Sequence, residues 1–133
     1  MAKHILAVDD NPDILEIVGF AFEHEGYIFE ATHSQHEMAE ALAQCLPDLI
    51  VLDLMLPGAN GYQVIEQLQH EPCTRGIPVI VITAKAEAMY RRISADLGVA
   101  KHLIKPFHPD ELVAQVREIF ADPPHEIFVA VGS

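Results

Sequence analysis

Basic residues are scarce in this sequence. It has 8 lysines and arginines against 20 aspartates and glutamates, which gives a formal net charge of −12. A surface of this sign repels the phosphates of nucleic acids and the headgroups of anionic membranes. The composition therefore argues against nucleic acid and membrane as direct partners of this domain, and it favours proteins or cations.

Long apolar runs and cysteines are also few. No apolar run approaches the ~20 residues that a membrane-spanning helix needs, and the N-terminus begins with a strand-like run instead of a secretory signal. The two cysteines, Cys45 and Cys73, are predicted to be reduced, packed thiols. With 133 residues, half of them hydrophobic, the chain is expected to form one cytoplasmic domain.

Short apolar runs alternate along the chain with segments of helical period. The expected strands are residues 4–8, 27–32, 48–55, 78–83 and 99–105, and the expected helices are residues 12–26, 34–45, 62–70, 86–97 and 109–120. Asn11, Pro12 and Gly26 are typical of helix ends, and Ser34 with Glu37 predicts a capping box. Strands of this kind indicate an α/β fold, with a doubly wound parallel sheet covered by helices on both faces.

The expected domain covers residues 1–121, and residues 122–133 form a tail or the start of a linker. Within this tail, residues 127–131 ("IFVAV") are apolar and β-prone. Such a segment tends to pair with a sheet edge or with another chain. Association to a homodimer, packing back on the domain, and a linker to a missing output domain all stay open. The chain is either a stand-alone domain or a fragment.

Two adjacent aspartates, Asp9 and Asp10, directly follow the first strand, and Asp53 lies near the end of the third. In open α/β sheets, ligands bind beyond the carboxyl ends of the strands. If the first and third strands are neighbours, three carboxylates meet there, and a cation would relieve their repulsion. Hard oxygen donors with room for water suit Mg²⁺. As alternatives, Asp9 is a helix cap and Asp53 caps the turn that follows it.

Two further polar residues end strands at the same edge. Thr83 ends the fourth strand with a hydroxyl, and Lys105 ends the fifth with an ammonium group. A cation, a hydroxyl and a lysine beside carboxylates form a site for a phosphoryl group, which a carboxylate can accept as an acyl phosphate. As alternatives, Thr83 is an ordinary strand residue and Lys105 is a solvated charge.

Four motifs in this order resemble the receiver domain of two-component response regulators. They are "VDDNPDIL", "PDLIVLDLMLPGANGYQVIEQL", "PVIVITAK" and "KHLIKPFHPDEL", and they are spread over residues 4–120. The resemblance implies a flavodoxin-like, five-stranded parallel sheet with strand order 2-1-3-4-5. It also implies a signalling switch, in which a sensor histidine kinase or a phosphotransfer protein phosphorylates an aspartate. The surface of the fourth helix, fifth strand and fifth helix would then change and control a downstream protein.

The resemblance implies a magnesium site made of four residues. Asp10 would bind Mg²⁺ directly and Asp9 through water, with further oxygens from Asp53 and from the backbone carbonyl of Met55.

The resemblance likewise implies a phosphorylation site. Asp53 is the expected phosphoacceptor, and the side chains of Thr83 and Lys105 and the backbone of Ala84 are expected to contact the phosphoryl group. The peptide bond before Pro106 is expected to be cis, which would position the lysine.

One position departs from the family pattern. Where receivers usually carry Tyr or Phe as a switch residue that moves together with the threonine, here Thr83, this chain has His102. Imidazole is smaller and polar, and it titrates near neutral pH. Switching is therefore hypothesised to be weaker, pH-dependent or directed to another partner surface. Alternatively, the imidazole only replaces the ring or stays outward.

Two other functions stay open beside the switch, which would act on itself and on no outside substrate. The first is a constitutive interaction module with a vestigial pocket. The second is a Mg²⁺-dependent phosphatase with Asp53 as transient nucleophile, although such enzymes need a second acid where this chain has Met55. The sequence names neither the kinase, the stimulus nor the downstream target.

Overall fold

The computed structural model describes residues 2–53, 56, 61–83, 101–104, 107–121 and 130–131, with only the backbone for residues 83, 101–104 and 130–131. The strands are β1 (His4–Val8), β2 (Ile28–Thr32), β3 (Leu49–Asp53), β4 (Val79–Thr83), β5 (Lys101–Ile104) and β6 (Ala130–Val131), and the helices are α1 (Pro12–His24), α2 (Gln35–Gln44), α3 (Gly61–His70) and α5 (Pro109–Ala121). The helix expected over residues 86–97 lies outside the described residues. Over these ranges, no helix has the length and hydrophobicity that crossing a membrane requires.

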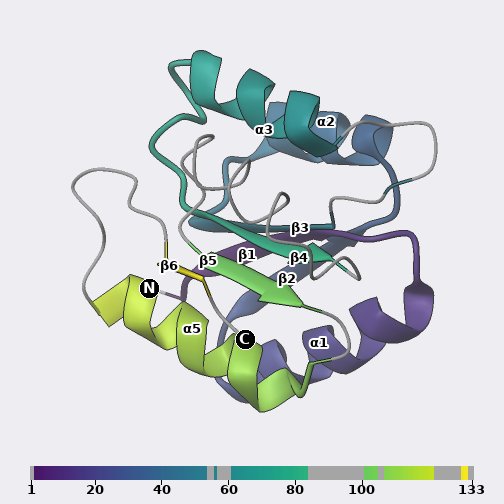
Figure 1. The fold of residues 1–133 in the computed structure, drawn as a ribbon, viewed down its shortest axis with the longest axis vertical. Helices are drawn as coiled ribbons and strands as arrows, with labels where there is room; N and C mark the ends of the chain where they lie inside the picture. Colours follow the sequence, from purple (N-terminus) through teal and green to yellow (C-terminus); the bar gives the residue numbers. More distant parts are fainter. Residues whose placement is uncertain are drawn as a thin grey trace.

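The strands form one parallel sheet. Their order is β2-β1-β3-β4-β5-β6, and each neighbouring pair is parallel. Helices α1 and α5 lie on one face of this sheet, and α2 and α3 lie on the other (Figure 1). The predicted doubly wound α/β fold is therefore confirmed, with its first five strands in the expected order.

The short strand β6 extends the sheet beyond the five strands expected. Its two residues pair with β5, Ala130 with Lys101 and Val131 with His102. The outer strand of an open sheet presents unpaired backbone groups, which a β-prone segment can satisfy. Part of the tail thus packs back on its own domain, which is one of the outcomes that the sequence left open.

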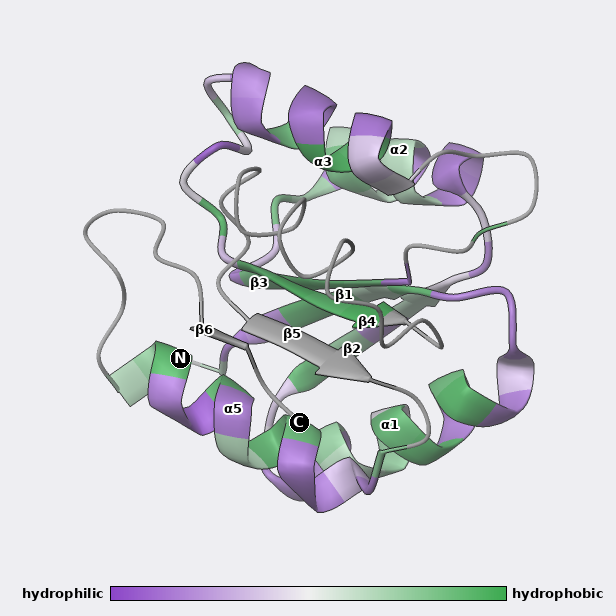
Figure 2. Ribbon diagram, viewed as in Figure 1, coloured by the Kyte–Doolittle hydropathy of each residue, from purple (hydrophilic) through white to green (hydrophobic). Residues whose placement is uncertain are grey.

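Both faces of the sheet are apolar. On β1, Ile5 and Ala7 pack into a buried cluster with α1 and α5, whereas Leu6 and Val8 pack into a second cluster with α2 and α3. Figure 2 shows the same division on the helices, whose hydrophobic sides turn toward the sheet and whose hydrophilic sides turn outward. Because the faces are filled by apolar side chains, the strand ends are where polar groups of the sheet can gather.

Helix α1 lies close to β2 because of a glycine. A Cβ at Gly19 would come within 2.7 Å of the Phe29 ring, so a larger residue there would force this ring or the helix to shift. The helix ends at His24, and Gly26 follows with a φ of 88°, a left-handed conformation that favours glycine. The predicted helix stop at Gly26 is therefore confirmed.

Both cysteines are free and exposed, so the prediction of packed thiols was wrong. Cys45 is the C-cap residue directly after α2, and its thiol donates a weak hydrogen bond to the carbonyl of Leu46 at 3.9 Å. Cysteine is usually a buried residue, but here the chain leaves the helix at the molecular surface.

Helix α2 begins with a shifted capping box. Ser34 Oγ accepts a hydrogen bond from the Glu37 backbone N–H at 3.1 Å, as predicted. The Glu37 carboxylate, however, accepts from the backbone N–H of His33 at 3.1 Å, one residue before the expected partner, and lies 3.2 Å from His33 Nδ1. These contacts, the backbone hydrogen bond first, hold the pKa of Glu37 below its ordinary value.

Replacing Glu37 by glutamine should change how the free energy of unfolding depends on pH. Since the pKa is lowered in the folded state, the ionised carboxylate stabilises the fold above its unfolded pKa of about 4.3, and this contribution is lost as pH falls through the lowered value. We expect Glu37→Gln to be less stable than the wild type at about pH 6, with a smaller difference below about pH 4. Urea unfolding at both pH values measures this.

Glu40→Gln is the matched control, because Glu40 is an exposed acid of the same helix that lies 3.1 Å from His36. Two results would contradict a stabilising role of the Glu37 carboxylate at the start of α2. One is a stability loss in Glu37→Gln that is equal at both pH values, and the other is the same loss in Glu40→Gln.

Candidate functional site

Three carboxylates meet at the carboxyl end of the sheet. Strand β1 pairs with β3 so that Val8 lies opposite Leu52, which places Asp9, the residue after β1, beside the last residue of β3, Asp53. Ligand oxygens of Asp9, Asp10 and Asp53 lie within 4.8 Å of one another. The three acids were expected to meet if the first and third strands are neighbours. These two strands are indeed neighbours, and they bring all three acids together.

The three acids differ in their exposure to water. Asp9 and Asp53 are only 1% and 2% exposed, while Asp10 is exposed. Burying two carboxylates beside a third is costly unless hydrogen bonds or a cation compensate the charge. Three hard oxygen ligands, two of them fixed in the fold and one open to solvent, fit a divalent cation that keeps several of its waters.

Asp9 is fixed by hydrogen bonds from its own segment and from the neighbouring strand. Its backbone N–H donates to the carbonyl of Thr32 at 3.1 Å, and its Oδ1 accepts from the backbone N–H of Asn11 at 2.9 Å. The helix cap is Asn11, whose Oδ1 accepts from the N–H groups of Asp13 and Ile14 at 3.0 and 3.4 Å. The alternative that Asp9 caps α1 is therefore wrong.

Helix α1 supports the same carboxylates electrostatically. It begins at Pro12, two residues after Asp10. The N-terminal end of a helix carries a partial positive charge that stabilises nearby anions, typically by about 0.3–1 kcal/mol. The pocket thus has one fixed source of positive potential from its own backbone.

The remaining predicted site residues are described only in part. Thr83 ends β4 and pairs through its backbone with Ile104, the last residue of β5. His102 pairs in the same way with Val81. The side chains of Thr83 and His102, together with Met55, Ala84, Lys105 and Pro106, lie outside the described residues, so their roles stay predictions. The turn that Asp53 was alternatively expected to cap also lies outside them.

Sequence reasoning missed one residue beside the acids, Thr32. It was interpreted only as the end of a strand, yet its carbonyl accepts from Asp9 and its hydroxyl bonds to the carbonyl of Ala7. A polar residue at the end of a β-prone strand was the available signal, and Thr32 proves to be the only buried residue of β2. The hydrogen-bond partners of this residue could not be predicted until the register between β1 and β2 was known.

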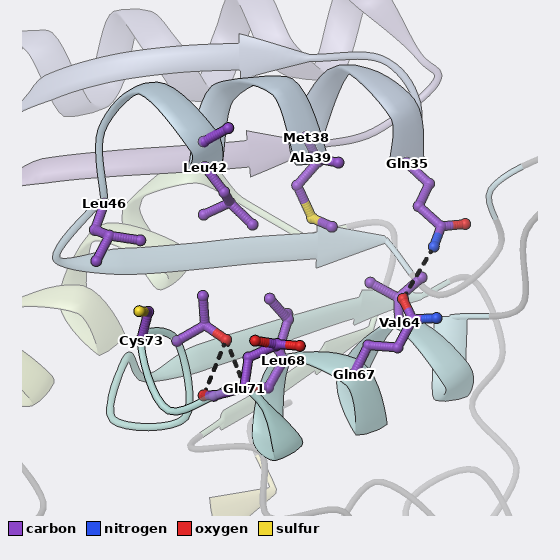
Figure 3. A pocket seen from close by; sticks show the side chains of 12 residues that line it. Gln35, Met38, Ala39, Leu42, Leu46, Val64, Gln67, Leu68, Glu71 and Cys73 are labelled. Carbon is purple, nitrogen blue, oxygen red and sulfur yellow. Dashed lines mark hydrogen bonds between the residues drawn. The ribbon is translucent and has the colours of Figure 1, made fainter.

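A groove between α2 and α3 offers different chemistry. It encloses about 310 Å³, and Figure 3 shows Met38 and Leu42 of α2 facing Leu68 of α3, with a 3.3 Å hydrogen bond between Gln35 and Gln67 across one end. Among the described residues that line it, Glu71 is the only carboxylate. Within the described part of the chain, the acidic group that could hold a cation therefore lies at the sheet edge and not in this groove.

Replacing Asp10 by asparagine should weaken stabilisation by Mg²⁺. A ligand at ten times its Kd stabilises the fold that binds it by about 1.4 kcal/mol. We expect the wild type to gain about this much in free energy of unfolding at that Mg²⁺ concentration, and Asp10→Asn to gain clearly less. Without Mg²⁺, the variant should be at least as stable as the wild type, because one of three like charges is removed. Thermal unfolding with and without Mg²⁺ measures both effects.

Asp13→Asn serves as the control, since it removes the same charge from the first turn of α1, outside the carboxylate group. Equal Mg²⁺ stabilisation in Asp10→Asn and the wild type would argue against a cation site at these acids.

The chain is similar to known proteins over most of its length. The family model of the response regulator receiver domain matches residues 5–117. A CheY-like receiver domain protein from Methanospirillum hungatei has a similar solved structure, with a TM-score of 0.84 and 25% identity, covering 92% of this chain and 96% of that one.

Curated relatives are longer than this chain. The phosphate regulon transcriptional regulatory protein PhoB of Escherichia coli (strain K12) is 39% identical over 119 residues, which are 90% of this chain and 52% of that protein. The DNA-binding response regulator MtrA of Mycolicibacterium smegmatis is 35% identical over 117 residues, 88% of this chain and 50% of that protein. The chain thus spans about half the length of these relatives. On the match of the family model, the chain belongs to the response regulator receiver domain family.

Proposed function

We propose that this chain is a phosphorylation-dependent switch in which Asp53 accepts a phosphoryl group from a phosphohistidine of a sensor kinase or phosphotransfer protein. The observation that carries the proposal is the convergence of Asp9, Asp10 and Asp53 within 4.8 Å at the end of β3. Asp53 is the acid that comes directly from the central strand pair, and it is held in a buried position beside the other two.

The proposed reaction is an in-line displacement at phosphorus. A carboxylate oxygen of Asp53 forms a bond to phosphorus while the bond from phosphorus to the donor imidazole breaks, and the imidazole leaves with its electron pair and takes up a proton. Hydrolysis ends the phosphorylated state: water attacks phosphorus, inorganic phosphate leaves and the free carboxylate of Asp53 is restored. Thr83 and Lys105 are proposed to contact the phosphoryl oxygens, with the Ala84 backbone.

The acids are proposed to hold Mg²⁺ during this transfer. Asp10 and Asp53 would bind it directly and Asp9 through water, with the carbonyl of Met55 as a further oxygen. When bound, the cation offsets the charge that builds on the phosphoryl oxygens. The chain's own contribution is to hold the acids in place before either the cation or the phosphoryl group arrives.

The output is proposed to be a change of protein surface. Phosphorylation would draw Thr83 toward the site and shift a two-state equilibrium over residues 86–97, β5 and α5. The chain would act in the cytoplasm, catalyse only its own phosphorylation and dephosphorylation, and control a downstream protein. The net charge of −12 supports a protein partner over nucleic acid for this domain.

The chemistry can be tested with a small phosphodonor. We expect acetyl phosphate with Mg²⁺ to add one phosphoryl group to the wild type, because the carboxylates and not the donor provide the catalysis. The gain should be absent in Asp53→Asn and strongly reduced without Mg²⁺. Intact-protein mass spectrometry at short times measures it.

Asp48→Asn is a suitable control, because Asp48 precedes the same strand at its opposite end and bonds to the His4 N–H. No gain in the wild type would favour either a switch that accepts phosphate only from a kinase or the vestigial module, and binding of beryllofluoride would separate these two. Phosphoester turnover beyond one equivalent would favour a phosphatase.

The donor is proposed to dock along α1. This helix exposes two large apolar side chains, Ile17 at 55% and Phe20 at 75%. Phe20 borders hollows on both sides, one of about 420 Å³ toward β2 and one of about 320 Å³ toward α5. Exposed aromatic residues beside concave surface are typical of protein contacts. Because α1 begins beside the carboxylates, a partner on this helix would bring its histidine near Asp53.

Phe20→Ala should separate docking from chemistry. We expect phosphotransfer from a kinase that phosphorylates the wild type to fall by about ten-fold, since central aromatic residues dominate contact energies. Phosphorylation by acetyl phosphate should be unchanged, because Phe20 is 75% exposed and contributes little to the fold. Initial rates with the two donors measure this.

Leu46→Ala is the matched control, as Leu46 is another exposed apolar residue, 48% exposed, on the side of α2. Equal losses in the two variants, or a loss with both donors, would remove α1 as the docking surface.

A further inference from the structure

Thr32 joins the two strands at the point where Asp9 leaves the sheet. It is the last residue of β2, is only 4% exposed and lies opposite Val8. Its Oγ1 donates a buried hydrogen bond to the carbonyl of Ala7 at 2.7 Å, and its own carbonyl accepts from the N–H of Asp9 at 3.1 Å. One residue of β2 thus bonds to β1 on both sides of Val8.

These two hydrogen bonds oppose the electrostatic repulsion between the carboxylates at the end of β1. The carboxylate of Asp9 is held within 4.8 Å of those of Asp10 and Asp53, and like charges at this distance repel. Repulsion would push the chain outward where it leaves β1, because Val8 is the last residue that pairs with both neighbouring strands and the ladder no longer holds the residues after it. A bond from the Thr32 hydroxyl to Ala7 holds the strand one residue before this end.

A valine would suit a buried strand position equally well in shape and would need no hydrogen-bond partner. A threonine here is therefore best explained by its hydroxyl.

We propose that Thr32 is a positioning residue of the cation site: its hydroxyl holds the end of β1, so that Asp9 keeps its place when the site takes up Mg²⁺. The inference rests on the cation site of the proposed function. Thr32 does not contact the cation or the phosphoryl group, and it acts through the backbone of Ala7 and Asp9.

The test compares a variant that lacks the hydroxyl group with one that keeps it. Thr32→Val keeps the shape and removes the hydroxyl, whereas Thr32→Ser keeps the hydroxyl. We expect Thr32→Val to raise the Kd for Mg²⁺, measured by calorimetry, by about ten-fold, as is usual for residues that orient metal ligands, and Thr32→Ser to restore it. In the absence of Mg²⁺, the backbone amide of Asp9 should exchange its hydrogen faster in Thr32→Val than in Thr32→Ser.

Thr74 provides a matched control within the same chain. It is 8% exposed, and its Oγ1 donates a hydrogen bond to the carbonyl of Leu68 at 2.7 Å, the same kind of bond as that of Thr32. Thr74 lies after α3 and lines the groove between α2 and α3. We expect Thr74→Val to lose stability as Thr32→Val does and to leave both the Kd for Mg²⁺ and the Asp9 amide exchange unchanged.

The outcomes separate this inference from the proposed function. An unchanged Kd in Thr32→Val, or an equal rise in Thr74→Val, would overturn the positioning role. Should Thr32→Val fail to fold, the comparison of Thr32→Ser with Thr32→Ala decides in the same way, since these two also differ by one hydroxyl. A wild type that binds Mg²⁺ but neither gains a phosphoryl group nor binds beryllofluoride would overturn the switch, while the Kd values would still decide the role of Thr32.

Discussion

Repulsion between three carboxylates at one edge of the sheet is the constraint on which the rest of the structure depends. Two of them are almost completely buried, so they cannot turn outward into water to relieve it. The backbone has to be rigid at this edge, and it is rigid because β1 and β3 are central strands with apolar helices packed on both faces. A hydrogen bond from the Asp9 N–H to the Thr32 carbonyl and one from the Asn11 N–H to the Asp9 carboxylate then complete the positioning of Asp9. Three carboxylates held this close together could hold a cation, which is the basis of the proposed function.

The helix that begins at this pocket links the acids to the proposed docking surface. Residues on its inner side, such as Val18 and Phe22, pack in the core, and Gly19 brings the helix close to β2. Its outer side leaves Ile17 and Phe20 in contact with water. Exposed apolar area is unfavourable in an isolated domain, and it becomes favourable when a partner covers it. One helix therefore both sets the electrostatics of the acids and presents a surface at a fixed distance from them.

Much of the fold and of the site could be predicted from local patterns. Continuous apolar runs indicated buried parallel strands, and Asn11 and Gly26 marked the ends of α1 correctly. The pair Asp9 and Asp10 predicted a cation pocket because adjacent acids at a strand end are costly without one. Exposure of single residues was harder to predict, as Cys45 shows. A thiol is usually buried, but here the position of the helix end decided its environment.

The sequence by itself determined the alternation of strands and helices, the acids at the strand ends and the acidic charge of the surface. These follow from residue type and spacing over a few neighbours along the chain. Only the tertiary structure decided that Asp53 meets Asp9, that Ala130 and Val131 add a strand to β5, and that Thr32 bonds on both sides of Val8. Each of these joins segments that are far apart in sequence. The register between strands, which sets such contacts, depends on the packing of the whole sheet and not on any one segment.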